Sequence, residues 1–243
     1  MSLNDISPLS DAERAALAGR LAVVTGASRG IGYAVASLLG ACGAQVVAVA
    51  RTVKGLEELD DEIRAAGGPA ATLVPLNLTD GPGVDQLGAS IFERWGKLDI
   101  LVGNAGVLGP ISPLGHVKAK DWASAMDVNV SANWRLIRTL DPVLRRSDAA
   151  RVLFMTAGDA STLRPYHGPY AVSKVALEAL ARTYALETEQ TTIKIGLHDP
   201  GAVRTQLRAK AVPGEDASTL PMPADIAPAI ARLCLPTSAP RLT

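Results

Sequence analysis

Residues 21–32 read LAVVTGASRGIG, a short apolar run followed by a turn that contains Gly26, Gly30 and Gly32. The apolar run suits a buried strand, and residues 31–39 continue in a helical pattern, so the glycines occupy a strand-to-helix turn. Glycine allows the tight bend and the close approach of backbone and helix, and the unpaired N–H groups of a helix N-terminus can bind a pyrophosphate. The order of strand, turn and helix therefore favours nucleotide binding over a plain glycine-rich loop.

Outward from this turn, strand-like runs alternate with helical patterns along the whole chain. The expected strands are 21–25, 45–50, 71–76, 100–103, 151–156 and 192–197. The expected helices are 30–41, 53–66, 84–95, 119–146 and 170–188. Because each strand is apolar enough to be covered on both faces, the pattern predicts a Rossmann-type α/β fold. Such a fold is a doubly wound parallel sheet in three layers (α/β/α), with ligands beyond the carboxyl ends of the strands.

The chain is expected to form one domain. Residues 1–19 are predicted to be a polar N-terminal arm with a helical turn at 11–17, and residues 20–243 a single Rossmann-fold domain. Within it, residues 202–222 lack a strong pattern, which favours a lid over the substrate. The Pro-rich stretches 220–228 and 236–240 are predicted to be loop and tail.

Composition argues against several classes of partner. The 243 residues include 24 Lys plus Arg and 24 Asp plus Glu, so no net charge attracts nucleic acid or an anionic membrane. No apolar stretch approaches the length of a bilayer span, and residues 1–5 lack the features of a signal peptide, so a cytoplasmic location is expected. Cys42 and Cys234 stand alone, without clustered His, so we expect reduced core cysteines and no metal site.

Tyr170 and Lys174 stand four residues apart in the predicted helix 170–188. Residues i and i+4 lie on one helix face, so the Lys174 ammonium can sit beside the Tyr170 phenol and favour its ionised form. A phenol so placed is a usable acid and base near neutral pH, as hydride transfer with a nicotinamide cofactor requires. Alone, the pair also fits a solvated lysine beside a half-buried tyrosine; the glycine turn favours the chemical interpretation.

From about residue 19 to residue 231 the chain resembles the classical short-chain dehydrogenase/reductase family. The motifs that match, in order, are Thr25-Gly26-x-x-x-Gly30-x-Gly32, Asn104-Ala105-Gly106, Asn129, Tyr170 with Lys174, and Pro200-Gly201 through Thr205. The resemblance implies that Tyr170 exchanges a proton with the substrate oxygen, that Lys174 favours the phenolate and contacts the nicotinamide ribose, and that Asn129 holds a relay water. Without the other motifs, Asn129 would fit a helix-kinking or capping residue.

The same resemblance implies which residues contact the cofactor. They are Gly26, Ser28, Arg29, Gly30, Ile31, Gly32, Arg51, Asn77, Leu78, Asn104, Ala105, Gly106, Tyr170, Lys174, Pro200, Gly201, Val203 and Thr205. Asn77 stands where relatives commonly carry Asp against the adenine, and its amide can serve that contact.

The choice of cofactor can be argued from charge. NAD-selecting enzymes place an acidic side chain after the second strand, whereas this chain has Arg51 there. A guanidinium fork can pair bidentately with a phosphate, and Arg29 in the turn adds a second charge. We therefore expect a preference for NADP(H), with NAD(H) possible.

Ala157 departs from the family pattern. Family members usually carry Ser about thirteen residues before the Tyr, where its hydroxyl bonds the substrate carbonyl, and the matching position here is Ala157. Thr156 is adjacent, but neighbouring side chains on a strand point to opposite faces, so Thr156 replaces that hydroxyl only if a bulge redirects it. Ser161 and Asp159 fit either a contributing role or plain loop residues. Loss of one such donor typically lowers turnover about a hundredfold to a thousandfold, which weakens an enzyme without abolishing it.

Two functions of different class remain open. One is an NADP(H)-dependent oxidoreductase that interconverts a carbonyl and an alcohol, slowed by Ala157 or using another donor. The other is a cofactor-binding protein with little catalysis, such as a sensor or partner subunit. Retention of Tyr170, Lys174 and Asn129 favours the first, and Ala157 favours the second.

Substrate and subunit contacts have weaker signatures. The candidates for the wall of a small-molecule pocket are Val107, Leu108, Leu163, Tyr166, His167, Val203 and Leu207. For His167, a place at the surface or at the substrate edge is favoured over catalysis. Helices 119–146 and 170–188 are rich in small and apolar residues, and in the family the equivalent pair packs against its copy, so the resemblance implies a homodimer. From the residues alone, simple packing of these helices on the sheet explains the same pattern. Family members usually end in a further strand with glycines; residues 233–243 lack it, which predicts a shortened C-terminal end and argues against a tetramer.

Overall fold

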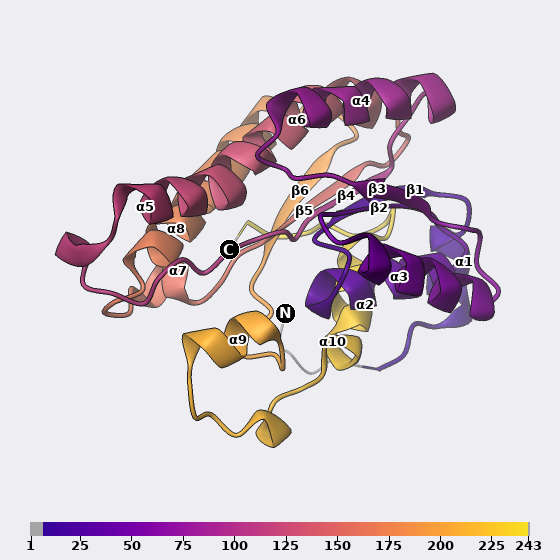
Figure 1. Ribbon diagram of the computed structural model, residues 1–243. Helices are drawn as coiled ribbons and strands as arrows, with labels where there is room; N and C mark the ends of the chain where they lie inside the picture. Colours follow the sequence, from indigo (N-terminus) through magenta and orange to yellow (C-terminus); the bar gives the residue numbers. More distant parts are fainter. Residues whose placement is uncertain (1–6, 243) are drawn as a thin grey trace.

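The computed structural model describes residues 7–242, apart from the side chains of Asp159 and Ser161, and in this part of the chain six parallel strands form one sheet (Figure 1). The strands are β1 (Leu21–Thr25), β2 (Gln45–Ala50), β3 (Thr72–Pro75), β4 (Ile100–Gly103), β5 (Arg151–Met155) and β6 (Lys194–His198). Their order is β3-β2-β1-β4-β5-β6, so the winding direction reverses between β1 and β4. This is the doubly wound sheet that the sequence predicts, and such sheets bind ligands at the reversal, beyond the carboxyl ends of the strands.

Helices cover both faces of the sheet. Those of residues 7–242 are α1 (Asp11–Leu17), α2 (Gly30–Ala41), α3 (Val53–Ala65), α4 (Gly81–Trp95), α5 (Ala119–Met126), α6 (Ala132–Leu144), α7 (Asp159–Thr162), α8 (Gly168–Glu187), α9 (Gln206–Ala211) and α10 (Pro223–Leu233). Helices α2, α3 and α10 lie on one face, with α1 beside them, and α4, α6 and α8 lie on the other (Figure 1). The three-layer α/β/α architecture is confirmed.

The sheet buries an apolar layer on each face. In β1, Ala22 and Val24 face the layer of α2 and α10, whereas Leu21 and Val23 face the layer of α4, α6 and α8. Full burial of one Val or Leu side chain contributes roughly 1.5–3 kcal/mol. These layers hold the strands in place, and the loops that follow their carboxyl ends carry the site.

The predicted helix 119–146 forms as three consecutive pieces. Between α5 and α6 lies a π-helical turn, Asp127–Ser131, in which the Ala132 N–H donates to the Asp127 carbonyl five residues back. Periodicity did not reveal this turn, because it spans only five residues within a continuous helical run. The other predicted helices and strands differ from the observed ones by no more than three residues at either end.

Part of the stretch predicted to be a Pro-rich loop is helical, so that prediction was wrong. Helix α10 begins at Pro223, where a missing N–H is harmless, and the Asp225 carboxylate accepts a hydrogen bond from the capping N–H at 2.7 Å. Ile226 and Ile230, one turn apart, are buried in the layer shared with α2. Their burial offsets the hydrogen bond that Pro228 removes from the helix.

Helix α1 forms at the predicted helical turn and packs on the domain. Ser10 and Glu13 make a capping box at its start, and Leu17 is fully buried. The Glu13 carboxylate also accepts a hydrogen bond from Arg232 of α10 at 2.8 Å. The N-terminal segment that the structure describes is thereby tied to α10.

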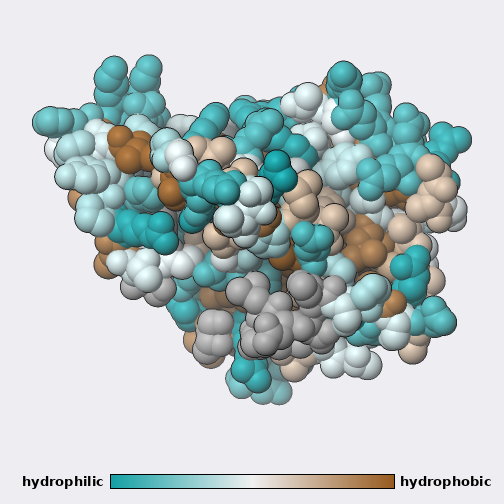
Figure 2. Space-filling model, turned by 90° about the horizontal axis from the view of Figure 1, so that it is seen from below, coloured by the Kyte–Doolittle hydropathy of each residue, from teal (hydrophilic) through white to brown (hydrophobic). Residues whose placement is uncertain are grey.

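The surface shows no helix suited to a bilayer in the described part of the chain: none is both long and apolar enough to span one. On the side that carries α9, Figure 2 shows apolar side chains in small separate groups among hydrophilic ones. Cys42 and Cys234 are buried, and burial raises the pKa of the Cys234 thiol to about 12. Among residues 7–242 no group of three His, Cys, Asp or Glu side chains is arranged to hold a metal ion.

Candidate active site

The glycine turn between β1 and α2 places backbone without side chains at the carboxyl edge of the sheet. Gly26 and Gly30 have φ values of 67° and 60°, which favour glycine. A Cβ at Gly26 would stand 2.8 Å from the Asn104 side-chain nitrogen, and a Cβ at Gly32 would meet the Gly26 carbonyl. Helix α2 starts directly after Arg29 without a side-chain cap, so its first N–H groups face this turn.

The segment after β4 is hydrogen-bonded to the same turn. The Thr25 hydroxyl accepts hydrogen bonds from the N–H groups of Asn104, at 3.0 Å, and Ala105, at 3.1 Å. The Asn104 amide donates to the Thr25 carbonyl at 2.9 Å. Residues 104–106 are thereby fixed beside the glycine turn, at the reversal of the sheet.

Tyr170 and Lys174 lie one turn apart on α8. The Lys174 Nζ is 5.6 Å from the centroid of the Tyr170 ring and donates to the Met155 carbonyl at 2.7 Å. Lys174 is 4% exposed. Burial lowers the pKa of Lys174 to about 8, although the carboxylates of Asp199 and Glu178 oppose this shift.

Asn129 lies in the π-helical turn and joins three elements. Its Oδ1 accepts from the Val107 N–H at 2.8 Å, and its Nδ2 donates to the Val107 carbonyl at 2.9 Å and to the Ser173 hydroxyl at 2.8 Å. The Ser173 hydroxyl in turn donates to the Tyr170 carbonyl at 2.8 Å. A Cβ at Gly106 would lie 3.3 Å from Asn129 Oδ1 and 3.7 Å from Lys174 Nζ. Asn129, Gly106 and Lys174 therefore meet at one point.

Ala157 follows β5 on this same edge. The neighbouring Thr156 donates its hydroxyl to Glu178 Oε1 at 2.6 Å, so its side chain is engaged with α8. This agrees with the alternation of side chains along a strand, and no bulge turns Thr156 toward the position of Ala157. The side chains of Asp159 and Ser161 lie outside the described part of the structure.

The remaining predicted cofactor residues also follow carboxyl ends of strands. Arg51 follows β2 and is exposed, as is Arg29; Asn77 and Leu78 follow β3. A Cβ at Gly55 of α3 would stand 2.5 Å from the Ser28 carbonyl, so the start of α3 packs closely on the turn.

After β6, residues 200–205 return to the glycine turn. Val203 is 2% exposed, and the Thr205 methyl lies 3.6 Å from where a Gly30 Cβ would stand. The Thr205 hydroxyl caps α9 by accepting from the Arg208 N–H. The predicted nicotinamide-side segment thus lies against the predicted pyrophosphate turn.

The loop before α8 has an uncommon backbone. Leu163 and Tyr166 have φ values of 47° and 68°, and both side chains are exposed. The Tyr166 carbonyl accepts from the Ser112 N–H at 2.9 Å, which ties this loop to the one after β4. His167, by contrast, is buried. The wall residues of the predicted pocket thus differ in exposure.

Comparison with known proteins identifies the family. The family described as short chain dehydrogenase matches residues 20–216. The chain belongs to the short-chain dehydrogenase family. The predicted family and enzyme class are confirmed, since relatives in this family are named oxidoreductases or dehydrogenases.

Three members of the short-chain dehydrogenase family indicate how far the similarity extends. The uncharacterized oxidoreductase YciK of Escherichia coli K12 is 34% identical over 211 residues, 86% of this chain and 83% of YciK. A solved structure from Pseudomonas syringae is 38% identical, with a TM-score of 0.92 over 98% of this chain and 96% of that one. A structure from Escherichia coli CFT073, solved in complex with NADPH, is 32% identical, with a TM-score of 0.88 over 91% of this chain and 93% of that one.

Two buried polar residues of this short-chain dehydrogenase were missed by sequence reasoning. Ser173 is fully buried between Asn129 and Tyr170, and Asn133 bonds the Asn129 main chain. Both stand on helix faces that otherwise bury apolar side chains. A polar residue within such a stripe, beside a motif residue, is the signal that could have found them.

Proposed function

We propose that this short-chain dehydrogenase is an NADP(H)-dependent oxidoreductase that interconverts a carbonyl and an alcohol. The observation that carries the proposal is the meeting of Tyr170, Lys174 and Asn129 beside the glycine turn, at the carboxyl edge of the sheet. A binding protein without chemistry would not need a buried lysine next to a tyrosine at this place.

The turn fits a dinucleotide, because α2 starts directly after it without a side-chain cap and leaves its first N–H groups for a pyrophosphate. Residues 26–32 would hold the pyrophosphate, Asn77 and Leu78 the adenine end, and residues 104–106 and 200–205 the nicotinamide half. When bound, the nicotinamide supplies or accepts the hydride.

Arg29 and Arg51 would select the phosphorylated cofactor. Arg51 precedes α3, whose start packs on Ser28, so Arg29 and Arg51 belong to segments that lie next to each other beside the turn. A guanidinium there would bind a 2′-phosphate bidentately. The NADPH bound by the relative from Escherichia coli CFT073 supports the same choice for this chain.

The proton would pass through Tyr170. The Lys174 charge beside its ring would stabilise the phenolate, and Lys174 would also bind the ribose. Both N–H groups of the Asn129 amide already donate to Val107 and Ser173. A relay water would therefore be held by an oxygen of Asn129.

Residues 20–243 would act as one domain, with residues 1–19 as an attached arm and residues 202–222 as a substrate lid. Within that lid, Arg208 of α9 makes two hydrogen bonds of 2.6 Å to the Glu215 carboxylate. This bidentate pair ties α9 to the loop that follows it. The lid would therefore move as a unit.

A second function is favoured by Ala157 alone. Without the hydroxyl that relatives place there, the chain would bind the cofactor and turn over slowly or not at all, as a sensor or partner subunit would. Thr156 is bonded to Glu178 and does not supply the missing donor.

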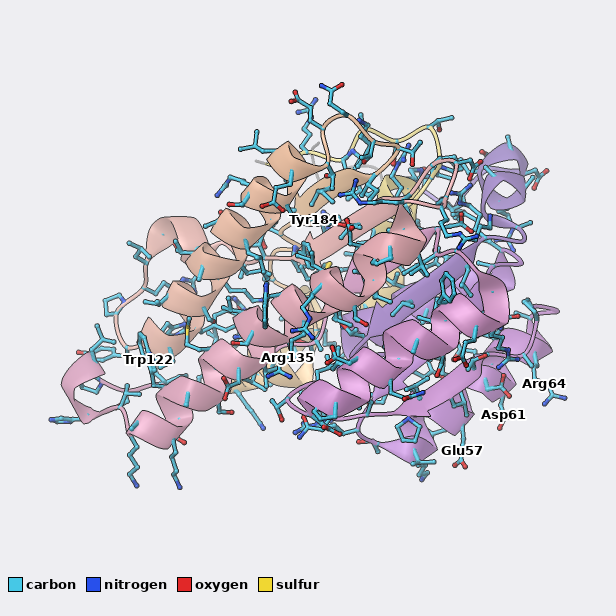
Figure 3. All side chains as sticks on the ribbon, turned by 90° about the horizontal axis from the view of Figure 1, so that it is seen from above. Glu57, Asp61, Arg64, Trp122, Arg135 and Tyr184 are labelled. Atoms are coloured by element: carbon cyan, nitrogen blue, oxygen red, sulfur yellow. The ribbon has the colours of Figure 1, made fainter. Side chains whose placement is uncertain are left out.

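Titration of the purified protein with NADPH and with NADH tests the cofactor assignment. We expect tighter binding of NADPH, and Arg51→Gln should weaken it about tenfold to a hundredfold while leaving NADH binding unchanged, because a charge-assisted bond contributes about 1.5–3 kcal/mol. Arg64→Gln is the matched control: Arg64 is exposed on α3, the helix that follows Arg51, and points away from the molecule in Figure 3. Preference for NADH would refute the assignment, and binding of neither cofactor would favour the second function.

A panel of carbonyl substrates with NADPH tests catalysis, with Ala157→Ser as the informative variant. A hydroxyl at this position should raise turnover at least about tenfold, since such a donor stabilises the developing oxyanion. Thr156→Val, which removes the bond to Glu178, should leave the effect of Ala157→Ser intact. If Ala157→Ser changes no activity, the missing donor does not limit this enzyme.

A further inference from the structure

Asn133 is a buried amide that the proposed chemistry does not use. It lies on α6, one turn after Asn129, and is 3% exposed. Asn is a poor helix former, and burial of an amide is destabilising unless its polar atoms are hydrogen-bonded. The Asn133 Nδ2 donates to the Asn129 main-chain carbonyl at 2.8 Å. The unfavourable burial of an Asn in this helix is therefore accompanied by a specific hydrogen bond to Asn129.

Asn133 also reaches the end of β4. Its Oδ1 lies 2.6 Å from where a Cβ would stand at Gly103, and the Phe154 ring lies 2.5 Å from the same point. The absence of a side chain at Gly103 leaves room for the Asn133 amide. Asn133 thus lies between the π-helical turn and the strand from which residues 104–106 begin.

The side chain of Asn129 is held in a single orientation. It makes three hydrogen bonds of 2.8–2.9 Å, to both main-chain groups of Val107 and to the Ser173 hydroxyl. These bonds can form together only if the backbone at Asn129 keeps its place in the turn, where the hydrogen-bond register changes from α to π. Asn133 bonds that backbone directly.

We propose that Asn133 is a positioning residue of the active site. It touches no reacting atom; it holds the Asn129 carbonyl, and through Asn129 it fixes Val107 after β4 and Ser173 beside Tyr170 and Lys174. This role rests on the proposed function, because it matters for turnover only if these groups carry out the reaction. It also has a structural consequence that can be measured without any substrate.

A matched pair of variants isolates the hydrogen bond from packing. In Asn133→Thr the hydroxyl can donate to the carbonyl four residues back, as threonine does in helices, whereas Asn133→Val has nearly the same shape and no donor. The first readout is hydrogen exchange of the Asn129 side-chain amide by NMR. We expect exchange at least about tenfold faster in Asn133→Val than in wild type or Asn133→Thr, because an ordered buried bond is lost. The Asn104 amide, bonded to Thr25, is the internal control.

The second readout is NADPH-dependent turnover. Asn133→Val should lower kcat about tenfold to a hundredfold with little change in NADPH affinity, since displaced catalytic groups lose rate before binding. Asn133→Thr should keep kcat within about threefold of wild type, because its back-bond keeps the same carbonyl in place. Val143→Ala, a buried change on the same helix, controls for loss of stability without loss of rate.

Three results would overturn the proposal. The first is equal exchange of the Asn129 side-chain amide in Asn133→Val and wild type, and the second is an equal loss of kcat in Asn133→Thr and Asn133→Val. The third is a loss of kcat in Val143→Ala that matches the one in Asn133→Val. If wild type turns over no substrate, the proposed function fails, and the exchange comparison alone still decides whether Asn133 positions Asn129.

Discussion

Lys174 carries its charge inside the protein. Its ammonium donates to the Met155 carbonyl at 2.7 Å, and the side chain is almost fully buried. Burial lowers the pKa of Lys174 to about 8, and the carboxylates of Asp199 and Glu178 limit that shift. The cation that the proposed chemistry uses is therefore destabilising to the fold, which is common for groups that an active site needs.

This destabilisation gives Lys174→Met a defined pH dependence. Below about pH 8 both the folded and the unfolded chain bind the lysine proton, so the full destabilisation is present, on the order of 3 kcal/mol. Between about pH 8 and the unfolded value of 10.5 the folded chain loses the proton first, so wild type gains stability as pH rises. The advantage of Lys174→Met over wild type should fall by about 3 kcal/mol across this window.

Urea unfolding at a series of pH values measures this difference between Lys174→Met and wild type. Lys210→Met is the matched control, because it removes the same type of charge from an exposed position on α9. A constant advantage of Lys174→Met from pH 7 to 10.5 would mean that the folded chain holds the lysine proton as tightly as the unfolded chain, so that burial does not lower the pKa of Lys174.

At the scale of single residues, sequence spacing was enough to predict the proximity of residues that share a motif. Tyr170 and Lys174 are one turn apart in any helix, so their proximity followed from the sequence. Ser173 and Asn133 belong to no pattern of their own, and only the meeting of α8 with the π-helical turn brings them to Asn129. Their roles depend on contacts between elements, which a single sequence does not state.

At the scale of elements, strands were easier to predict than the helix that carries Asn129. β1 and β2 are buried on both faces, so their continuous apolar runs are unambiguous. The π-helical turn is only five residues long and lies within a continuous helical run, so it has no strong sequence signal. For α10, the prediction gave more weight to the two prolines than to the buried positions that include Ile226 and Ile230. Pro223 nevertheless occupies the first helical position, where proline is favoured.

At the scale of the whole molecule, one edge of the sheet is partly paired by the C-terminal segment. β6 is the last strand in the order of the sheet, and its Leu197 N–H donates to the Arg241 carbonyl. The C-terminal segment therefore pairs with part of this edge, which disfavours an assembly built on it. The outer face of α6 and α8 carries exposed apolar side chains, among them Trp134 and Leu186.

That surface lies over the helices that were predicted to form a dimer. A hollow of about 360 Å³ lies between α6 and α8; its lining includes Trp134, Leu180 and Tyr184 as well as the charged residues Arg138, Asp141, Arg145 and Glu187. Leu186 is 75% exposed, and Val175 is exposed on the same helix. In Figure 3, α4, α6 and α8 lie side by side on this face, with Tyr184 on α8 at the boundary with α6.

We predict that the chain forms a symmetric homodimer through α6 and α8 and that Trp134→Glu separates it. Trp134 is 46% exposed, and an aromatic side chain at the centre of an interface commonly contributes 2 kcal/mol or more, so a buried charge there should weaken the dimer at least about thirtyfold. Phe92→Glu is the matched control, because Phe92 is 51% exposed on the neighbouring helix α4, outside the proposed contact. Sedimentation velocity at micromolar protein should give about twice the 25.2 kDa chain mass for wild type and Phe92→Glu, and the chain mass for Trp134→Glu. A monomeric wild type would refute the dimer, and a dimer that survives Trp134→Glu unchanged would place the contact on another face.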